Sequence, residues 1–240
     1  MASGGRGGGG TAEQRRARVR LEISREAARL FWAQGVAATS GAQIAGAAGV
    51  STRTVWRHFR SKESCAEPVV TQGALALVRV LRRWPRHSSL EEHLVTELSA
   101  VRGTLPPAGL ADELLGMRMI VLAGTEPALR TAWLMACDQT ERELGVIIGE
   151  RLGRPVGDLE VRTHAAAAAA VVRVLDEHIG AAVLADADLT GYRDVPSLSR
   201  HFAHAIHTAT RGIVGEPVGP VGPVGPGGPG EPDEPGEPAA

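Results

Sequence analysis

Two short helical patterns joined by a glycine turn, within residues 39–59, constrain the fold of this chain more than any other feature. The first begins after Thr39 or Ser40, either of which can cap it, and Gly49 ends it. The second runs from about 52 to 59 after Ser51, which can cap it in the same way. The inner apolar positions are Ile44, Ala45 and Ala48 in the first pattern, and Val55 and Phe59 in the second. Two short helices that meet at a tight turn form a helix-turn-helix.

The rest of the chain also has helical periodicity, and no segment alternates convincingly in the way of a strand. We predict a fourth helix from Ser61, its cap, to about Arg83, with a kink at Pro68 in its second turn. The other predicted helices are 12–33, 88–103, 109–122, 125–151 (capped by Thr125), 157–185 and 196–213. The sequence therefore predicts an all-α fold, with a three-helix head at 11–62 on a larger helical-bundle body at 63–214.

Both ends of the chain have compositions that do not support a packed core. Residues 1–10 contain six glycines and should form a flexible arm, and residues 215–240 are rich in proline and glycine and should be disordered. Charge is also uneven. Residues 1–62 contain eleven basic and three acidic side chains, a net charge of +8, although the whole chain has a net charge of only −1. This end is suited to a polyanion, although a basic stretch can also be an ordinary solvated face.

The helix at 52–59 has the geometry of a recognition helix. If Val55 and Phe59 face inward, the turn of about 100° per residue directs Arg53 and Arg57 outward. Arginine suits bidentate contact with guanine in the major groove of DNA. Two alternatives stay open: the arginines are plain exposed charges, or Trp56 packs on the neighbouring helix. The arm arginines at 6, 15, 16, 18 and 20 have three possible roles, namely phosphate contact, minor-groove insertion, or none.

These residues resemble the tetracycline-repressor (TetR) family of bacterial regulators over roughly a fifth of the chain. The resemblance is carried by Ile23, Ala27, Leu30, Phe31, Gly35, Thr39, Ser40, Ile44, Ala45, residues 47–51, Thr54, Trp56, His58, Phe59 and residues 61–63. Three residues depart from the family pattern: Trp56 stands where tyrosine is usual, and Cys65 and Pro68 replace the commoner leucine and helix formers in the helix that joins head and body.

The resemblance implies contacts, partners and an assembly. Together with the capping Ser51, the residues expected at double-stranded DNA are Ser40, Gln43, Thr52, Arg53, Thr54, Trp56, Arg57, His58 and Lys62. The family pattern also implies a homodimer on a palindromic operator, with the helices at 157–185 and 196–213 forming a four-helix interface. We therefore expect a repressor that a small hydrophobic ligand releases from DNA. The alternative is a DNA-binding regulator whose body is a protein-interaction module without a small-molecule effector.

Candidates for the ligand pocket come from helical stripes in the body. They are Trp84, Met117, Ile120, Leu129, Trp133, Cys137 and Thr140, although the same residues could simply form a core.

The sequence contains no recognisable residues for catalysis, metal binding or membrane insertion. No catalytic constellation, phosphate-binding loop or dinucleotide fingerprint is recognisable, so we expect neither an enzyme nor a cofactor. His201, His204 and His207 fan around their helix without a completing ligand, so no metal site is predicted. Cys65 and Cys137 are expected as small apolar fillers. With no apolar run long enough to span a bilayer and no signal peptide, we expect a cytoplasmic protein without a membrane partner.

Overall fold

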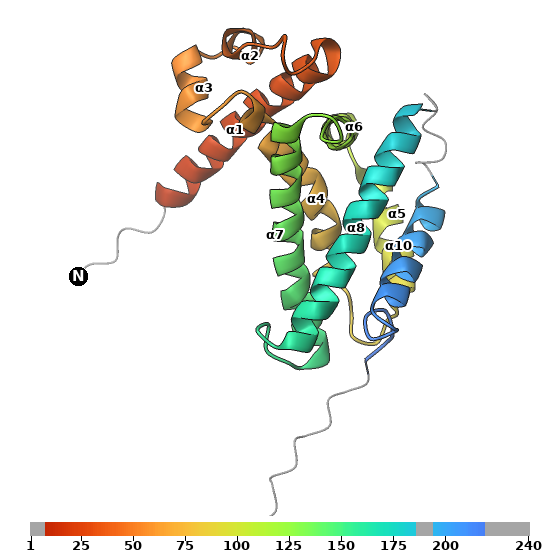
Figure 1. Ribbon diagram of the computed structural model, residues 1–240. Helices are drawn as coiled ribbons and strands as arrows, with labels where there is room; N and C mark the ends of the chain where they lie inside the picture. Colours follow the sequence, from red (N-terminus) through yellow and green to blue (C-terminus); the bar gives the residue numbers. More distant parts are fainter. Residues whose placement is uncertain (1–7, 186–193, 219–240) are drawn as a thin grey trace, which may run out of the picture.

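The computed structural model describes residues 8–185 and 194–218, which are helical and contain no strand, as predicted (Figure 1). The α-helices are α1 (Gly8–Gln34), α2 (Gly41–Ala47), α3 (Thr52–His58), α4 (Glu67–Leu81), α5 (Leu90–Thr104), α6 (Pro107–Leu122), α7 (Pro127–Leu152), α8 (Leu159–Ala185) and α10 (Val195–Ala209). A short 3-10 helix, η1 (Glu63–Ala66), precedes α4. In the described part of the chain, no helix is long and apolar enough to cross a membrane.

The head consists of α1, α2 and α3. Ser40, not Thr39, caps α2: its hydroxyl accepts from the Gln43 N–H at 3.2 Å, and the Gln43 side chain accepts from the Ser40 N–H at 2.8 Å. Thr39 is buried instead, and its hydroxyl donates to the Gly35 carbonyl at 2.8 Å. Gly49 lies in the left-handed region at φ 63°, which lets the chain turn directly into α3.

The junction between head and body differs from the predicted kinked helix. Residues 63–66 form η1, and α4 starts at Glu67, so Pro68 lies in the first turn of α4 and not inside a longer helix. A first-turn proline costs no intrahelical hydrogen bond, because its missing N–H would be unpaired there anyway. The next free N–H, that of Val69, donates to the buried Ser24 hydroxyl of α1 at 3.1 Å. The predicted kink is therefore wrong, and the junction is a helix start anchored on the head.

The buried apolar side chains form two cores, and the first of them extends past residue 62, the predicted end of the head. The first joins the head to η1, the first half of α4, α6 and the first half of α7. The second joins the rest of α4 and α7 to α5, α8 and α10. The head therefore shares its core with the upper part of the body.

Smaller differences occur at helix ends. Thr125 does not cap α7, whose N-cap is Glu126; the Thr125 hydroxyl donates back to the Leu122 carbonyl. Helix α10 ends at Ala209, four residues before the predicted end. Residues 8–10 belong to α1, and the rest of the predicted arm lies outside the described residues.

The start of the predicted disordered tail is packed. The Gly215 carbonyl accepts from the Leu90 N–H at 2.7 Å, and the Val218 N–H donates to the Arg86 carbonyl at 2.7 Å. The prediction of disorder is therefore wrong for residues 215–218, because they close the α4–α5 turn; residues 219–240 lie outside the described residues.

Candidate nucleic-acid interface and body cavity

The outer face of α3 carries two arginines, as the helical geometry predicts. Val55 and Phe59 are buried beneath the helix, while Arg53 and Arg57, one turn apart, are exposed. Among the described residues, neither guanidinium has a hydrogen bond or an ion pair. Their donors are therefore available to an external acceptor.

Trp56 stands beside this pair and packs across the start of α2. A Cβ at position 41 would overlap the indole ring, so glycine at this position lets the ring lie against the backbone. The ring still has 45% of its area exposed. Trp56 therefore packs on the neighbouring helix α2, and its exposed part still belongs to the surface that carries Arg53 and Arg57.

The hydroxyl and amide side chains expected at DNA lie at the starts of α2 and α3. Ser40 and Gln43 form the capping pair of α2 and are exposed. The Ser51 hydroxyl accepts from the Thr54 N–H at 3.1 Å and lies 2.8 Å from the Thr54 hydroxyl. Thr52 is exposed beside Arg53. These groups hold the two helix starts in place and border the arginine surface.

Lys62 has a structural contact that sequence reasoning missed. Its ammonium donates to the carbonyls of Val36 at 2.7 Å, Ala37 at 3.3 Å and Thr39 at 2.9 Å. An ammonium has three N–H donors, so these contacts engage all of them. Lys62 ties the turn between α1 and α2 to the start of the body.

The N-terminal part of α1 adds cations to the α3 surface. Arg15 and Arg16 line a groove between α1 and α3 together with Arg57 and His58. Burial lowers the pKa of His58, and the charges of Arg57, Arg16 and Arg20 lower it further. The two helices thus form one positively charged surface, which we call the basic face: Arg15, Arg16, Arg53, Arg57 and His58.

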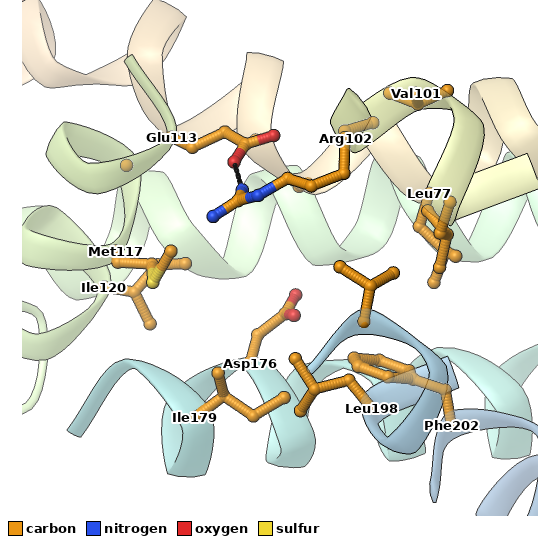
Figure 2. Close-up of a pocket in the computed structure, with 16 residues that line it drawn as sticks. Leu77, Val101, Arg102, Glu113, Met117, Ile120, Asp176, Ile179, Leu198 and Phe202 are labelled. Atoms are coloured by element: carbon orange, nitrogen blue, oxygen red, sulfur yellow. Dashed lines mark hydrogen bonds and ion pairs between the residues drawn. The ribbon is translucent and has the colours of Figure 1, made fainter. Parts of the chain in front are cut away.

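A cavity of about 200 Å³ lies in the body between α4, α5, α6, α8 and α10 (Figure 2). Two of the seven predicted pocket residues, Met117 and Ile120 of α6, line it. Most of its wall is apolar, including Leu77, Leu98 and Phe202.

The other five predicted pocket residues do not line this cavity. Leu129, Trp133 and Thr140 are buried in the packing of α7, and the Trp133 indole donates to Glu177 at 2.8 Å. Trp84 is buried in the second core, with the Arg151 guanidinium 3.4 Å from its ring centroid. Cys137 is half-buried and packs against the first core. Burial raises the pKa of the Cys65 and Cys137 thiols to about 12, in agreement with a role as fillers.

Three ionisable side chains reach the cavity, and none of them is among the residues predicted from the sequence. Arg102 of α5 and Glu113 of α6 form an ion pair at its wall. Asp176 of α8 points into the cavity (Figure 2), and burial raises the pKa of this carboxyl to about 7. One signal was available: Asp176 lies four residues after the buried Val172 and three before Ile179, so it interrupts an apolar helix face.

The cavity is physically connected to the head through α6. Arg25 of α1 donates twice to Asp112 of α6, from Nε to Oδ1 at 2.7 Å and from Nη2 to Oδ2 at 2.6 Å. Asp112 is only 9% exposed, and its chain neighbour Glu113 lines the cavity. A second contact places the Arg118 guanidinium 5.2 Å from the Trp32 ring centroid.

Comparison with known proteins decides the family. Residues 23–69 match the family model described as bacterial regulatory proteins, tetR family, and residues 99–192 match the MftR C-terminal domain. The chain is 32% identical over 153 residues to the HTH-type transcriptional regulator TcmR of Streptomyces glaucescens, covering 63% of this chain and 68% of that protein. The chain belongs to the TetR family. It is therefore a DNA-binding transcriptional regulator.

Solved structures agree with the fold of a TetR-family regulator. GusR of Salmonella enterica superposes with a TM-score of 0.53 at 18% identity, covering 81% of this chain and 96% of GusR. The SmeT–triclosan complex superposes with a TM-score of 0.51 at 16% identity, covering 89% of this chain and all of SmeT (100%). At these identities the similarity concerns the fold alone.

The histidines of α10 have separate environments in this TetR-family regulator. The His201 ring bonds the Ser197 carbonyl at 2.8 Å, His204 is exposed, and the His207 ring lies 3.5 Å from Glu216. Within residues 8–185 and 194–218, no three His, Cys, Asp or Glu side chains gather so as to hold a metal ion.

Proposed function

We propose that this TetR-family regulator is a repressor that binds a palindromic operator as a homodimer and is released by a small hydrophobic ligand. The observation that carries the proposal is the pair Arg53 and Arg57, exposed one turn apart on α3 and without an ion pair in the described residues. Each guanidinium offers the parallel donors that match guanine O6 and N7 in the major groove.

The surrounding side chains suit phosphate contacts, which orient the helix without selecting a sequence. Arg15 and Arg16 of α1 extend the same surface, which favours phosphate contact over minor-groove insertion for these two. The further contacts in the proposal are Ser40, Gln43, Ser51, Thr52, Thr54, Trp56 and His58. Lys62 can join them only by giving up a carbonyl.

Selection of bound duplexes from a random pool tests the head. We expect an inverted repeat whose half-site centres lie about 34 Å apart, one helical turn, with guanine at the positions that Arg53 and Arg57 contact. Arg53→Ala plus Arg57→Ala should cost about 2–6 kcal/mol of discrimination against other sequences and leave thermal unfolding unchanged. The matched control is Arg83→Ala plus Arg142→Ala, two exposed arginines of the body outside the proposed DNA and dimer surfaces. Retained discrimination in the first variant would refute the assignment of this surface.

The outer side of α8 supports the proposed dimer. Ala166, Ala170 and Val174 recur every four residues and are exposed, and Val174 has 53% of its area accessible. Small apolar residues at this spacing form a stripe on which a second helix can approach closely. Helix α10 packs beside α8, so the two helices together can supply the four-helix interface.

Light scattering after size exclusion tests the dimer. Val174→Asp should yield a monomer, because it introduces a charge in the centre of the apolar stripe. Met135→Asp, on the exposed side of α7, is the matched control and should stay dimeric. A dimeric Val174→Asp variant would contradict the proposed interface.

Ligand release is supported by the elements that the cavity shares with the head. Helix α6 lines the cavity and holds Arg25 through Asp112, while α4 lines it and holds Ser24 through Val69. A ligand that separates α4 from α6 would therefore alter the angle of the head and the spacing of the two recognition helices. The cavity favours this effector over the alternative of a filled protein-interaction body. In transcription assays with the selected operator, the regulator should lower promoter output; increased output would instead indicate an activator.

A further inference from the structure

We propose that the body cavity binds a small hydrophobic cation, with the Asp176 carboxylate as the partner of its positive charge. The inference deepens the proposed effector site, and it rests on that site being the ligand-binding part of the regulator.

The described wall of the cavity is apolar apart from three ionisable groups. Leu77, Met117 and Ile179 are typical of the lining, and the ionisable groups are Arg102, Glu113 and Asp176. Arg102 and Glu113 neutralise each other in an ion pair. Asp176 adds a second carboxylate, so the three described groups carry a net charge of −1 when all are charged.

The charge of Asp176 is not balanced within the described residues, which provide its carboxyl group with no hydrogen bond or ion pair. Its neighbour Glu177 is a like charge and adds to the rise in the Asp176 pKa. The Glu177 carboxylate has its own partners, namely Arg130, Arg173 and the Trp133 indole. A carboxylate without a partner in an apolar cavity is costly. A bound cation would supply the missing partner.

Other ligand charges fit the cavity less well. An anion would meet Asp176 directly, and it would have to compete with Glu113 for Arg102. A neutral apolar ligand would fill the volume but leave the carboxylate unpaired. The volume of about 200 Å³ is small for a ligand pocket, which limits the occupant to a compact molecule.

Three probes of similar size separate these ligand classes. Benzyltrimethylammonium is a compact hydrophobic cation, neopentylbenzene has the same shape without the charge, and benzenesulfonate is an anion. Titration calorimetry on the full-length protein, without DNA, should give an affinity for the cation about tenfold or more above that of either other probe.

Asp176→Asn tests the partner. This variant should lose the preference for benzyltrimethylammonium over neopentylbenzene, without a fall in unfolding temperature, because it removes a desolvated charge. Asp138→Asn makes the same chemical change at an exposed site on α7 and should keep the preference.

The dependence of binding on pH provides a second measurement. The charged or titratable groups near Asp176 are Arg102 on α5, Glu113 on α6, Cys137 on α7 and Glu177 on α8; the cavity residues of α4 and α10 are not ionisable. Because Asp176 must lose its proton to pair with a cation, affinity for benzyltrimethylammonium should rise by roughly tenfold from about pH 6 to about pH 8. Neopentylbenzene should not show this rise, and neither should the cation with Asp176→Asn.

Failure of this inference can be told apart from failure of the proposed function. Tighter binding of the neutral or anionic probe, or no binding of the cation, would overturn the assignment of a cationic ligand while operator binding still stands. An unchanged cation preference in Asp176→Asn would overturn it too. Binding of the cation through Asp176 without release of the selected operator supports the ligand class and refutes only the effector role.

Discussion

The basic face of the head and the cavity of the body use charge in opposite ways. On the head, Arg53 and Arg57 stand exposed above a small apolar core and have no ion pair within the described residues. In the body, Arg102 and Glu113 neutralise each other, and Asp176 is held inside an apolar space. The head presents its charges outward, whereas the cavity encloses a single unbalanced one.

The difference shows what each surface can discriminate. Exposed arginines keep full hydration until DNA arrives, so their selectivity comes from donor geometry against base edges. An enclosed carboxylate has already lost much of its hydration, so its selectivity comes from the charge of the occupant. Substitution of Arg53 or Arg57 should therefore affect binding alone, whereas substitution of Asp176 should change stability as well as binding.

The largest effect is expected at Trp133, which lies in the body core and not at the cavity. Trp133→Ala should lower the free energy of unfolding by about 3–5 kcal/mol, because it leaves a large hole in a core position that is 1% exposed. Denaturant unfolding measures this loss. Trp133→Phe, which keeps most of the volume, should bind benzyltrimethylammonium like the parent protein. Loss of benzyltrimethylammonium binding in a folded Trp133→Phe variant would show that Trp133 belongs to the ligand site after all.

Trp133 also shows where sequence reasoning reached its limit. The basic face was predictable, because Val55, Phe59, Arg53 and Arg57 lie on one helix whose period determines their directions. The cavity is built from five helices spread over residues 73–202, and a stripe such as Leu129 and Trp133 is the same in sequence whether it meets a ligand or another helix. The carbonyl contacts of Lys62 could not be predicted for a similar reason, because the partners are 23 to 26 residues away in the sequence.

The second effect tests how the two regions are joined. Arg25→Met leaves Asp112 nearly buried without its bidentate partner, and should cost about 2 kcal/mol in the free energy of unfolding. Arg29→Met removes a surface pair with Glu26 on the same helix, and should cost less than about 1 kcal/mol. Arg25→Met should also weaken any effect of a cavity ligand on operator binding. Equal losses of stability in the two variants would contradict a special role for the Arg25–Asp112 contact.

The third effect is smaller and distinguishes Lys62, whose ammonium is bonded to backbone carbonyls, from the exposed arginines of the basic face. Lys62→Met should lower the free energy of unfolding by about 1–2 kcal/mol, because three carbonyls of the α1–α2 turn lose a charged donor. Arg60→Met, which removes an exposed pair with Glu67, should cost less. The slope of log affinity against log salt should stay unchanged in Lys62→Met, whereas Arg16→Ala, at a residue proposed to contact phosphate, should reduce it by about one. A reduced slope with unchanged stability in Lys62→Met would show that Lys62 binds phosphate instead.

The smallest effect concerns His58, whose pKa is lowered by burial and then by Arg57, Arg16 and Arg20. In the free protein this lowered pKa opposes protonation, so the stability that the neutral ring contributes is present above about pH 6.5 and decreases as the pH falls below it.

Phosphates bound along the basic face would offset the three arginines and raise the pKa of His58, so DNA binding should take up a proton. Operator affinity should therefore increase as the pH falls from about 8 to about 6, by less than about tenfold, and fluorescence anisotropy at constant ionic strength can measure it. His58→Gln should remove this increase, whereas His204→Gln, at an exposed position on α10, should keep it. If His58→Gln keeps the full pH dependence, another group takes up the proton. That outcome would contradict a DNA-binding surface that runs from α3 across His58 to Arg15 and Arg16 of α1.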